Sequence, residues 1–103
     1  MTQFDYQVEL YIRCCKDRKS SKLLDFLKSI DLSKIKAEEA EKQCKTDMFW
    51  IEVAYIKFRR NDYSQERNDR RDAISILEQN CYYNIERAIS LANEFNVFND
   101  SPE

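Results

Sequence analysis

The absence of glycine constrains the fold of this chain more than any other feature of its sequence. None of the 103 residues is glycine, and the single proline, Pro102, stands at the C-terminal end. Sheets with tight hairpins depend on glycine, proline and Asn-Gly turns, which supply the special backbone angles that such turns need. Helices can instead be closed by Asn, Asp and Ser. The sequence therefore predicts an all-α fold.

Apolar residues recur with helical periodicity in about six segments, which we assign to one domain over residues 1–103. The first segment has an apolar face of Phe4, Val8, Tyr11, Ile12 and Cys15. The second follows a cap at Ser20 or Ser21 and carries Leu23, Leu24, Leu27 and Ile30. Asp31 and Ser33 mark a turn before the third, whose sparse stripe is Ile35, Ala37, Ala40 and Cys44. Its charged residues Glu38, Glu39, Glu41, Lys42 and Lys45 are expected to face water.

The segment from Met48 to Phe58 is apolar almost all round, with Asp47 as its expected cap. A helix of this kind is buried on several sides, so it should lie in the middle of the domain with Trp50 largely buried. The polar stretch 59–69 predicts an irregular connection, after which Asp69 or Asp72 caps a fifth helix. The sixth helix is expected from Asn84 to Phe95, followed by a frayed end over residues 99–103.

Short connections between consecutive helices favour antiparallel pairs. The helix–turn–helix pattern occurs three times, at a spacing of roughly 30 residues, which favours a right-handed stack of antiparallel helical hairpins, an α-solenoid. The alternative is a closed, irregular six-helix domain. A stack leaves apolar surface on its end helices, here Val8 and Ile12 at one end and Ile89 and Phe95 at the other. We therefore expect partners that are other helical chains, including copies of this one.

Charge and composition argue against several functional classes. The net charge is −2 and the chain has no histidine, so it has no general attraction for nucleic acid or anionic membranes. No Ser-His or Cys-His pair and no glycine-rich phosphate loop is possible, so we expect neither an enzyme nor a bound cofactor. The cysteines Cys14, Cys15, Cys44 and Cys81 lack the spacing of a metal site and are expected to be reduced thiols of a cytosolic protein. We expect neither a signal peptide nor a membrane span.

Three clusters admit a chemical interpretation. Glu38, Glu39 and Glu41 could act as paired carboxylates, although a solvated helix face explains them more simply. Cys14 and Cys15 could form a reactive pair, but their apolar flanks favour a raised thiol pKa. A nucleic-acid alternative rests on an arginine-rich stretch with one interleaved aromatic: Arg59, Arg60, Tyr63, Arg67, Arg70 and Arg71. The acidic residues of the same stretch favour a self-neutralising connection instead: Asp62, Glu66, Asp69 and Asp72.

Two stretches resemble clathrin heavy-chain leg repeats. Residues 8–31 are similar in the Asp17-Arg18 turn and in the following Asp25-Phe26-Leu27. Residues 73–95 are similar in an aliphatic helix followed by an Asn-aliphatic-acid-Arg-Ala sequence: Ala73, Ile76, Leu77, Asn84, Ile85, Glu86, Arg87, Ala88 and Ala92. The chain departs from the family at Tyr83, where glycine is usual, and in the longer, charged stretch 62–71. Vacuolar sorting and tethering proteins use the same repeat.

The resemblance implies a segment or reduced relative of a longer α-solenoid. It further implies a non-catalytic scaffold for protein–protein interaction in vesicle coats and intracellular trafficking. The expected location is the cytoplasm, at coated vesicles or endosomal membranes. The alternatives are a closed helical adaptor and a nucleic-acid-binding domain that uses the Arg59–Arg71 stretch.

Overall fold

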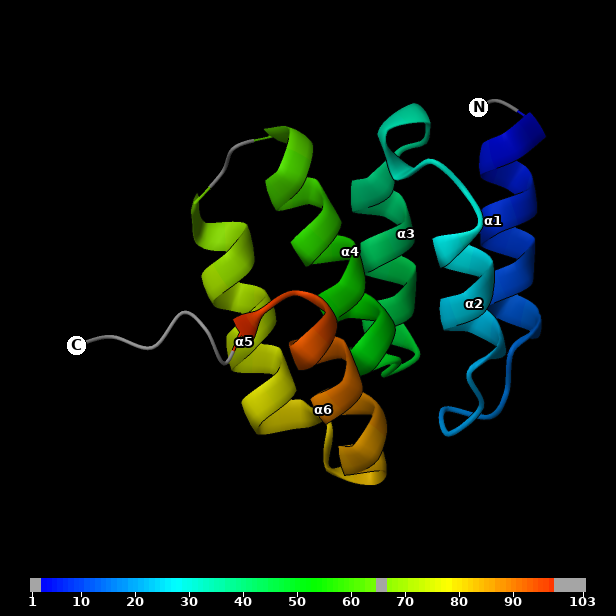
Figure 1. Ribbon diagram of the computed structural model, residues 1–103. Coiled ribbons are helices and arrows are strands. Elements are labelled where there is room, and N and C mark those ends of the chain that lie inside the picture. The colour runs from blue at the N-terminus through cyan, green and yellow to red at the C-terminus, as the bar shows by residue number, and fades with distance from the viewer. Residues whose placement is uncertain (1–2, 65–66, 98–103) are drawn as a thin grey trace.

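A computed structural model describes residues 3–64 and 67–97, with side chains for residues 6–61 and 68–97 (Figure 1). The described residues form six α-helices and two short 3-10 helices. They are α1 (Gln3–Cys14), α2 (Lys22–Lys28), η1 (Leu32–Lys34), α3 (Ala37–Thr46), α4 (Trp50–Ser64), α5 (Arg67–Asn80), η2 (Tyr82–Asn84) and α6 (Ile85–Glu94). The all-α prediction is therefore confirmed for the described part of the chain.

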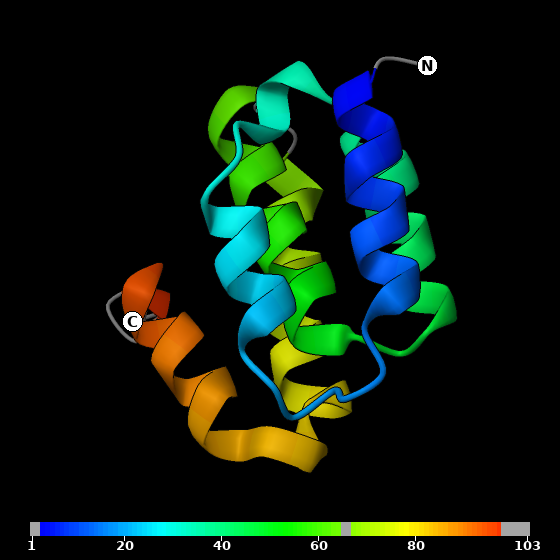
Figure 2. The same ribbon diagram turned by 90° about the vertical axis from the view of Figure 1, so that its right-hand side faces the viewer.

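Consecutive helices alternate in direction. In Figure 1, α1, α3 and α5 run downward while α2, α4 and α6 run upward, with α1 and α5 on opposite sides of the molecule. The turned view shows α1 in front of α3 and α2 in front of α4 (Figure 2). Helix α1 packs on α3, α2 packs on α4, and α6 packs on both α4 and α5. Each helical hairpin therefore packs against the hairpin that follows it in the chain.

Helix α4 lies at the centre, as its apolar sequence predicts. It contacts α2, α3, α5, α6 and η1, and every side chain over residues 51–58 is buried. Trp50, the first residue of α4, is partly buried and packs against the core, so its predicted burial is confirmed in part. Phe49, immediately before the helix, occupies the core position instead, with an exposed fraction of 2%.

The turn between α3 and α4 closes with a methionine where glycine is usual. Met48 has a φ of 61°, in the left-handed region. The Phe49 amide donates to the Cys44 carbonyl at 2.8 Å, and the Met48 amide donates to the Lys45 carbonyl at 3.1 Å. This pair of hydrogen bonds is a Schellman motif, with Met48 in the position that favours glycine. Asp47 therefore ends α3 and does not cap α4, contrary to the sequence prediction.

The stretch 59–69 was predicted as an irregular connection, and this prediction was wrong. Helix α4 continues to Ser64 and α5 already begins at Arg67, so Asp69 and Asp72 lie inside α5 and not at the position before its first residue. The stretch contains neither glycine nor proline, the two residues that most strongly interrupt helices. The polar residues that follow Phe58 did not end α4 at that point.

The turn predicted at Asp31 and Ser33 and the helix start predicted at Asn84 are confirmed, and in each case a side chain caps the helix that follows. The Asp31 carboxylate accepts hydrogen bonds from the Ser33 amide at 3.0 Å and the Ser33 hydroxyl at 2.6 Å, and these bonds lower the pKa of Asp31. The Asn84 side chain accepts from the Arg87 amide at 3.2 Å at the start of α6. Ser21 precedes α2 without a capping bond, while the Ser20 hydroxyl accepts from the Lys22 amide at 3.2 Å. The predicted frayed end at 99–103 lies outside the described residues.

Candidate functional site

An apolar groove lies between α5 and α6. It has a volume of about 280 Å³ and is lined by Ile74, Leu77, Glu78, Cys81, Tyr82, Ile85, Ala88, Ile89, Ala92 and Val97. We call this the α5–α6 groove. Ala88 and Ala92 line it with methyl groups and are themselves buried. Glu78 is the one ionisable carboxylate among the lining residues.

Large apolar side chains of the α5–α6 groove are open to solvent. The exposed fractions are 71% for Tyr82, 57% for Ile85 and 48% for Ile89. Ile85 and Ile89 are four residues apart and therefore share one helix face. The predicted exposure of Ile89 is confirmed, but Phe95 is partly buried and stacks on Phe58 at 4.5 Å between ring centroids. An exposed cluster of aliphatic and aromatic side chains is typical of an interaction surface.

The opposite end of the domain carries a second exposed apolar strip. Tyr6 and Leu10 on α1 have exposed fractions of 56% and 48%, and we call this pair the α1 ridge. The prediction that Val8 and Ile12 form this end surface was wrong, because both are buried in the core. Helix α3 covers the face of α1 that carries them. The solvent-exposed face of α1 is formed instead by Tyr6 and Leu10.

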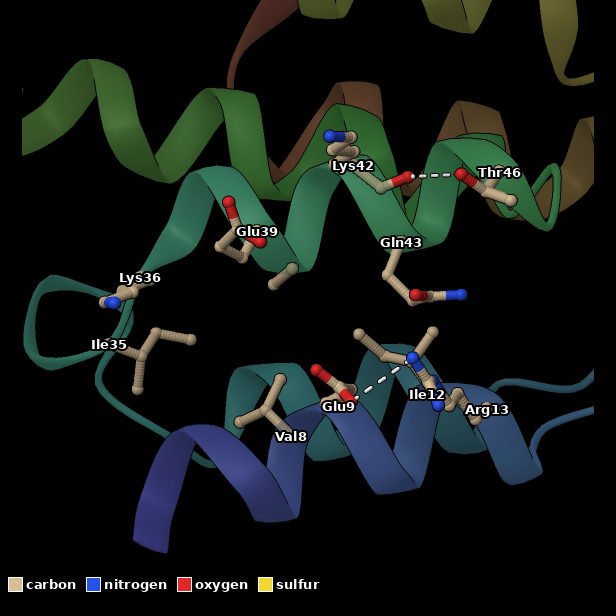
Figure 3. Close-up of a pocket in the computed structure, with 11 residues that line it drawn as sticks. Val8, Glu9, Ile12, Arg13, Ile35, Lys36, Glu39, Lys42, Gln43 and Thr46 are labelled. Atoms are coloured by element: carbon tan, nitrogen blue, oxygen red, sulfur yellow. Dashed lines mark hydrogen bonds and ion pairs between the residues drawn. The ribbon is translucent and has the colours of Figure 1, made fainter. Parts of the chain in front are cut away.

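The cleft between α1 and α3 is lined mainly by polar and charged side chains (Figure 3). Val8 and Ile12 point from α1 toward α3, and the Glu9–Arg13 ion pair of 3.3 Å lies beside them. The remaining charged lining residues are Lys36, Glu39 and Lys42. The two signs of charge are mixed along the cleft, so it offers no concentrated field for an anionic or cationic ligand. It separates two packed helices and has no array of like charges.

A polar cluster around the buried Glu52 joins the turns at one end of the domain. The Arg87 guanidinium donates to Glu52 Oε2 at 2.9 Å and to the carbonyl oxygen of Arg18 at 3.0 Å. The Asn84 amide group donates to the carbonyl oxygen of Lys19 at 3.3 Å. Residues of the α1–α2 turn, of α4 and of the α5–α6 turn are thereby held together. We call Arg18, Glu52, Tyr83, Asn84 and Arg87 the turn cluster.

Tyr83 completes the turn cluster. Its hydroxyl accepts a hydrogen bond from the Ile51 amide at 3.1 Å, and the Arg18 guanidinium lies 4.4 Å from the centre of its ring. Arg18 also donates to the Met48 carbonyl at 3.4 Å. Burial raises the pKa of Tyr83 to about 12 and raises the pKa of Glu52, although Arg87 opposes the second shift. The contacts of the turn cluster stabilise the packing of the three segments that they join.

The cysteines do not converge on a site. Cys14 is exposed, Cys15 is half-buried, and Cys44 and Cys81 are buried, all as free thiols. Burial raises the pKa of Cys15, as its apolar flanks predicted, and raises the pKa of Cys81 to about 12. Burial also raises the pKa of Cys44 well above its ordinary value. Within the described residues, no group of three or more Cys, Asp or Glu side chains is placed to hold a metal ion.

The acidic residues of α3 divide into two groups. Glu38 and Glu39 are exposed, as predicted. Glu41 was predicted to face water, and this was wrong: it is buried between two cations of α4. Its carboxylate oxygens lie 2.9 Å from Lys57 Nζ and 2.8 Å from an Arg60 guanidinium nitrogen. The predicted pair of carboxylates is therefore split between solvent and an interhelical ion-pair network.

The arginine-rich stretch is partly engaged within the fold. Arg60 binds Glu41, and Arg70 donates to the Phe95 carbonyl at 3.0 Å. The Arg59 guanidinium lies 5.6 Å from the centre of the Tyr55 ring. Arg71 is exposed, while the side chains of Tyr63 and Arg67 lie outside the described residues. These contacts direct part of the stretch toward the protein's own helices.

Comparison with known proteins does not extend the description. No family model, curated protein or solved structure matches this chain. Across residues 3–64 and 67–97, none of the helices has both the length and the apolar character needed to cross a membrane. The fold and surface define an all-helical domain with an open apolar groove at one end.

Proposed function

We propose that the protein is a non-catalytic scaffold that binds other helical chains, as a segment of an α-solenoid of the clathrin heavy-chain leg type. The observation that carries this proposal is the α5–α6 groove, with Tyr82, Ile85 and Ile89 open to solvent. A helix that lays apolar side chains at i and i+4 spacing into such a groove is a common mode of recognition. Removing these side chains from water provides the driving force.

The arrangement of the helices supports the solenoid part of the proposal. Helix α3 follows α1 in one row, and α4 and then α6 follow α2 in another. In a solenoid, hairpins stack in the order of the chain, and the last one presents a face for the next. The α5–α6 groove is on that last hairpin. A partner hairpin seated there would extend the stack.

The two stretches that resemble clathrin heavy-chain repeats contact each other. Arg18, from the first stretch, stacks on Tyr83, and its carbonyl accepts from Arg87 of the second. Tyr83 replaces the glycine that is usual in the family, and its ring and hydroxyl serve as contacts that glycine lacks. These stretches form the first and third hairpins, so the contact spans the α3–α4 hairpin that lies between them in the chain.

The resemblance extends the proposal to cellular context. We place the protein in the cytoplasm, at coated vesicles or endosomal membranes, where it would join coat or tethering subunits. Many weak contacts along a scaffold give assembly that is stable in aggregate and reversible at each contact. A shallow groove with a few exposed side chains suits a weak, repeated contact.

Affinity capture from cell extract tests the proposal. The wild-type protein is compared with Ile89→Glu, which places a charge in the α5–α6 groove, and with Ser90→Glu, which adds the same charge at an exposed neighbouring position. We expect the wild type and Ser90→Glu to retain helical coat or tethering subunits and Ile89→Glu to lose them. Identical partners for all three proteins, or capture of nucleic acid alone, would contradict the proposal.

A further inference from the structure

The α1 ridge and the α5–α6 groove are complementary surfaces on one chain. The ridge consists of Tyr6 and Leu10, which project from the outward face of α1. The groove lies between the two helices of the last hairpin. Figure 1 shows α1 and α5 on opposite sides of the molecule, so a chain cannot place its own ridge in its own groove. We propose that the α1 ridge of one copy occupies the α5–α6 groove of a second copy.

The spacing of side chains suits this pairing. Tyr6 and Leu10 are four residues apart, as are Ile85 and Ile89, so both pairs repeat at about 6 Å along their helices. Side chains of one helix pack between rows of side chains on another when such spacings agree. The methyl groups of Ala88 and Ala92 leave room beside Ile85 and Ile89 for the larger ridge residues.

The parallel direction of α1 and α5 would also bring opposite charges together in the proposed contact. Helices α1 and α5 run the same way in Figure 1, so a second copy that continues the stack places its α1 parallel to α5. The C-terminal end of α1 carries Arg13, which is exposed and paired with Glu9 at 3.3 Å, and exposed Lys16 follows after the helix. The C-terminal turn of α5 carries exposed Glu78, which lines the groove. A parallel arrangement therefore brings cations of the ridge end toward the groove's carboxylate.

The two faces differ, so the contact is heterologous. A copy that uses its ridge keeps its groove free for another copy, and head-to-tail contacts of this kind can extend without closing. The inference rests on the proposed function, since it names the partner of the same groove. Each contact uses one helix against one hairpin, which is small beside a stable protein interface. Association should therefore be weak and should increase with concentration.

Two singly blocked variants test the geometry. Leu10→Glu blocks the ridge and leaves the groove, while Ile89→Glu blocks the groove and leaves the ridge. Sedimentation velocity should show a wild-type mass that rises with concentration and monomers for each variant alone. An equimolar mixture of the two should form a 1:1 dimer and nothing larger, because each partner has one working face. Gln7→Glu, an exposed neighbour on α1, is the matched control and should associate like the wild type.

Several outcomes would overturn the proposal. A mixture that stays monomeric excludes the pairing of ridge with groove. Dimers of Leu10→Glu alone would indicate groove-to-groove contact, and dimers of Ile89→Glu alone would indicate contact between ridges. Circular dichroism and thermal unfolding of both variants confirm that the exposed substitutions leave the fold intact. A wild-type protein that is monomeric at every concentration overturns this inference alone, while capture of coat subunits still decides the proposed function.

Discussion

Arg87 on α6 and Glu52 on α4 form a buried ion pair, with 2.9 Å between the Arg87 guanidinium and Glu52 Oε2. The Glu52 side chain is 1% exposed and that of Arg87 is 15% exposed. No described residue provides a hydrogen bond to the other oxygen of Glu52. The charge and hydrogen bond of Arg87 therefore offset the cost of removing the Glu52 carboxylate from water. Arg87 also holds the turn after α1 in place by donating to the Arg18 carbonyl.

Removing one partner of this pair should be costly. We expect Arg87→Ala to lower the free energy of unfolding by about 3–5 kcal/mol, because Glu52 is left buried without its cation. Urea unfolding followed by circular dichroism measures the change. Arg13→Ala is the control, since its pair with Glu9 lies on the surface and should contribute at most about 0.5 kcal/mol. Equal effects of the two substitutions would contradict the inferred burial of Glu52.

Burial of Glu52 also predicts a pH dependence. Desolvation raises the pKa of Glu52 in the folded protein above its unfolded value, despite the opposing hydrogen bond and charge of Arg87. The folded state therefore binds the Glu52 proton more tightly than the unfolded state does. This contribution to stability is fully present below the unfolded pKa, about 4.3, and is lost as pH rises through the folded pKa.

A matched substitution isolates that dependence. Glu52→Gln removes the titration while keeping the size of the side chain. We expect the stability of the wild type, relative to Glu52→Gln, to fall as pH rises from about 4 toward neutrality. Urea unfolding of both proteins across this range measures the difference. A wild type that gains relative stability with rising pH would show that the ion pair outweighs desolvation.

Glu41 provides an independent test on the other side of α4. Its carboxylate contacts both Lys57 and Arg60, whose side chains are 11% and 18% exposed. Glu41→Ala leaves two partly buried cations without this partner, and we expect a loss of about 3 kcal/mol. Glu39→Ala on the same helix removes an exposed carboxylate and should change stability by no more than about 0.5 kcal/mol. Similar losses for both would mean that Glu41 faces water, as its sequence context first indicated.

The contrast between Glu41 and its neighbours shows where sequence periodicity stops being informative. The apolar run over residues 51–58 was sufficient to predict a central helix, because few arrangements other than burial on all sides accommodate it. Glu41 could not be distinguished from Glu38 or Glu39 by residue type. Its partners, Lys57 and Arg60, lie 16 and 19 positions away, and only the packing of α3 on α4 brings them together.

The same limit applies to the surface. Ile89 was predicted to be exposed because it lies on the last helix, but Tyr82 and Ile85 were missed as members of the α5–α6 groove. Their exposure depends on where the α5–α6 turn places them, which periodicity does not encode. For α1, helical spacing alone identified an apolar face, while the exposed pair Tyr6 and Leu10 was apparent only once α3 covered the other side.

The absence of glycine predicts a stabilising substitution. Met48 adopts a φ of 61° with an exposed side chain, so it carries the backbone strain of a left-handed residue without a compensating role in the core. We expect Met48→Gly to stabilise the protein by about 0.5–1 kcal/mol, after the larger entropy of glycine in the unfolded chain is subtracted. Thermal unfolding measures the change. Asp47→Gly, where φ is −92°, is the control and should destabilise.

Two aromatic residues of α4, Phe58 and Trp50, should differ in their contribution to stability. Phe58 is 1% exposed and stacks on Phe95, with ring planes 6° apart and centroids 4.5 Å apart. Trp50 begins the helix and packs against the core from its edge, only partly buried. Phe58→Ala should therefore cost about 3–5 kcal/mol, because it leaves a cavity that the surrounding helices cannot fill.

Trp50→Ala should cost clearly less than Phe58→Ala, although tryptophan is the larger side chain, since part of its surface is already in contact with water. Urea unfolding of both variants gives the comparison. The fluorescence of Trp50 in the native protein provides a second measurement that needs no substitution. Its emission should lie between that of a fully buried and a fully exposed tryptophan and should shift to longer wavelength on unfolding. A native emission typical of a dry core, or a loss of stability equal to that of Phe58→Ala, would contradict the partial burial of Trp50.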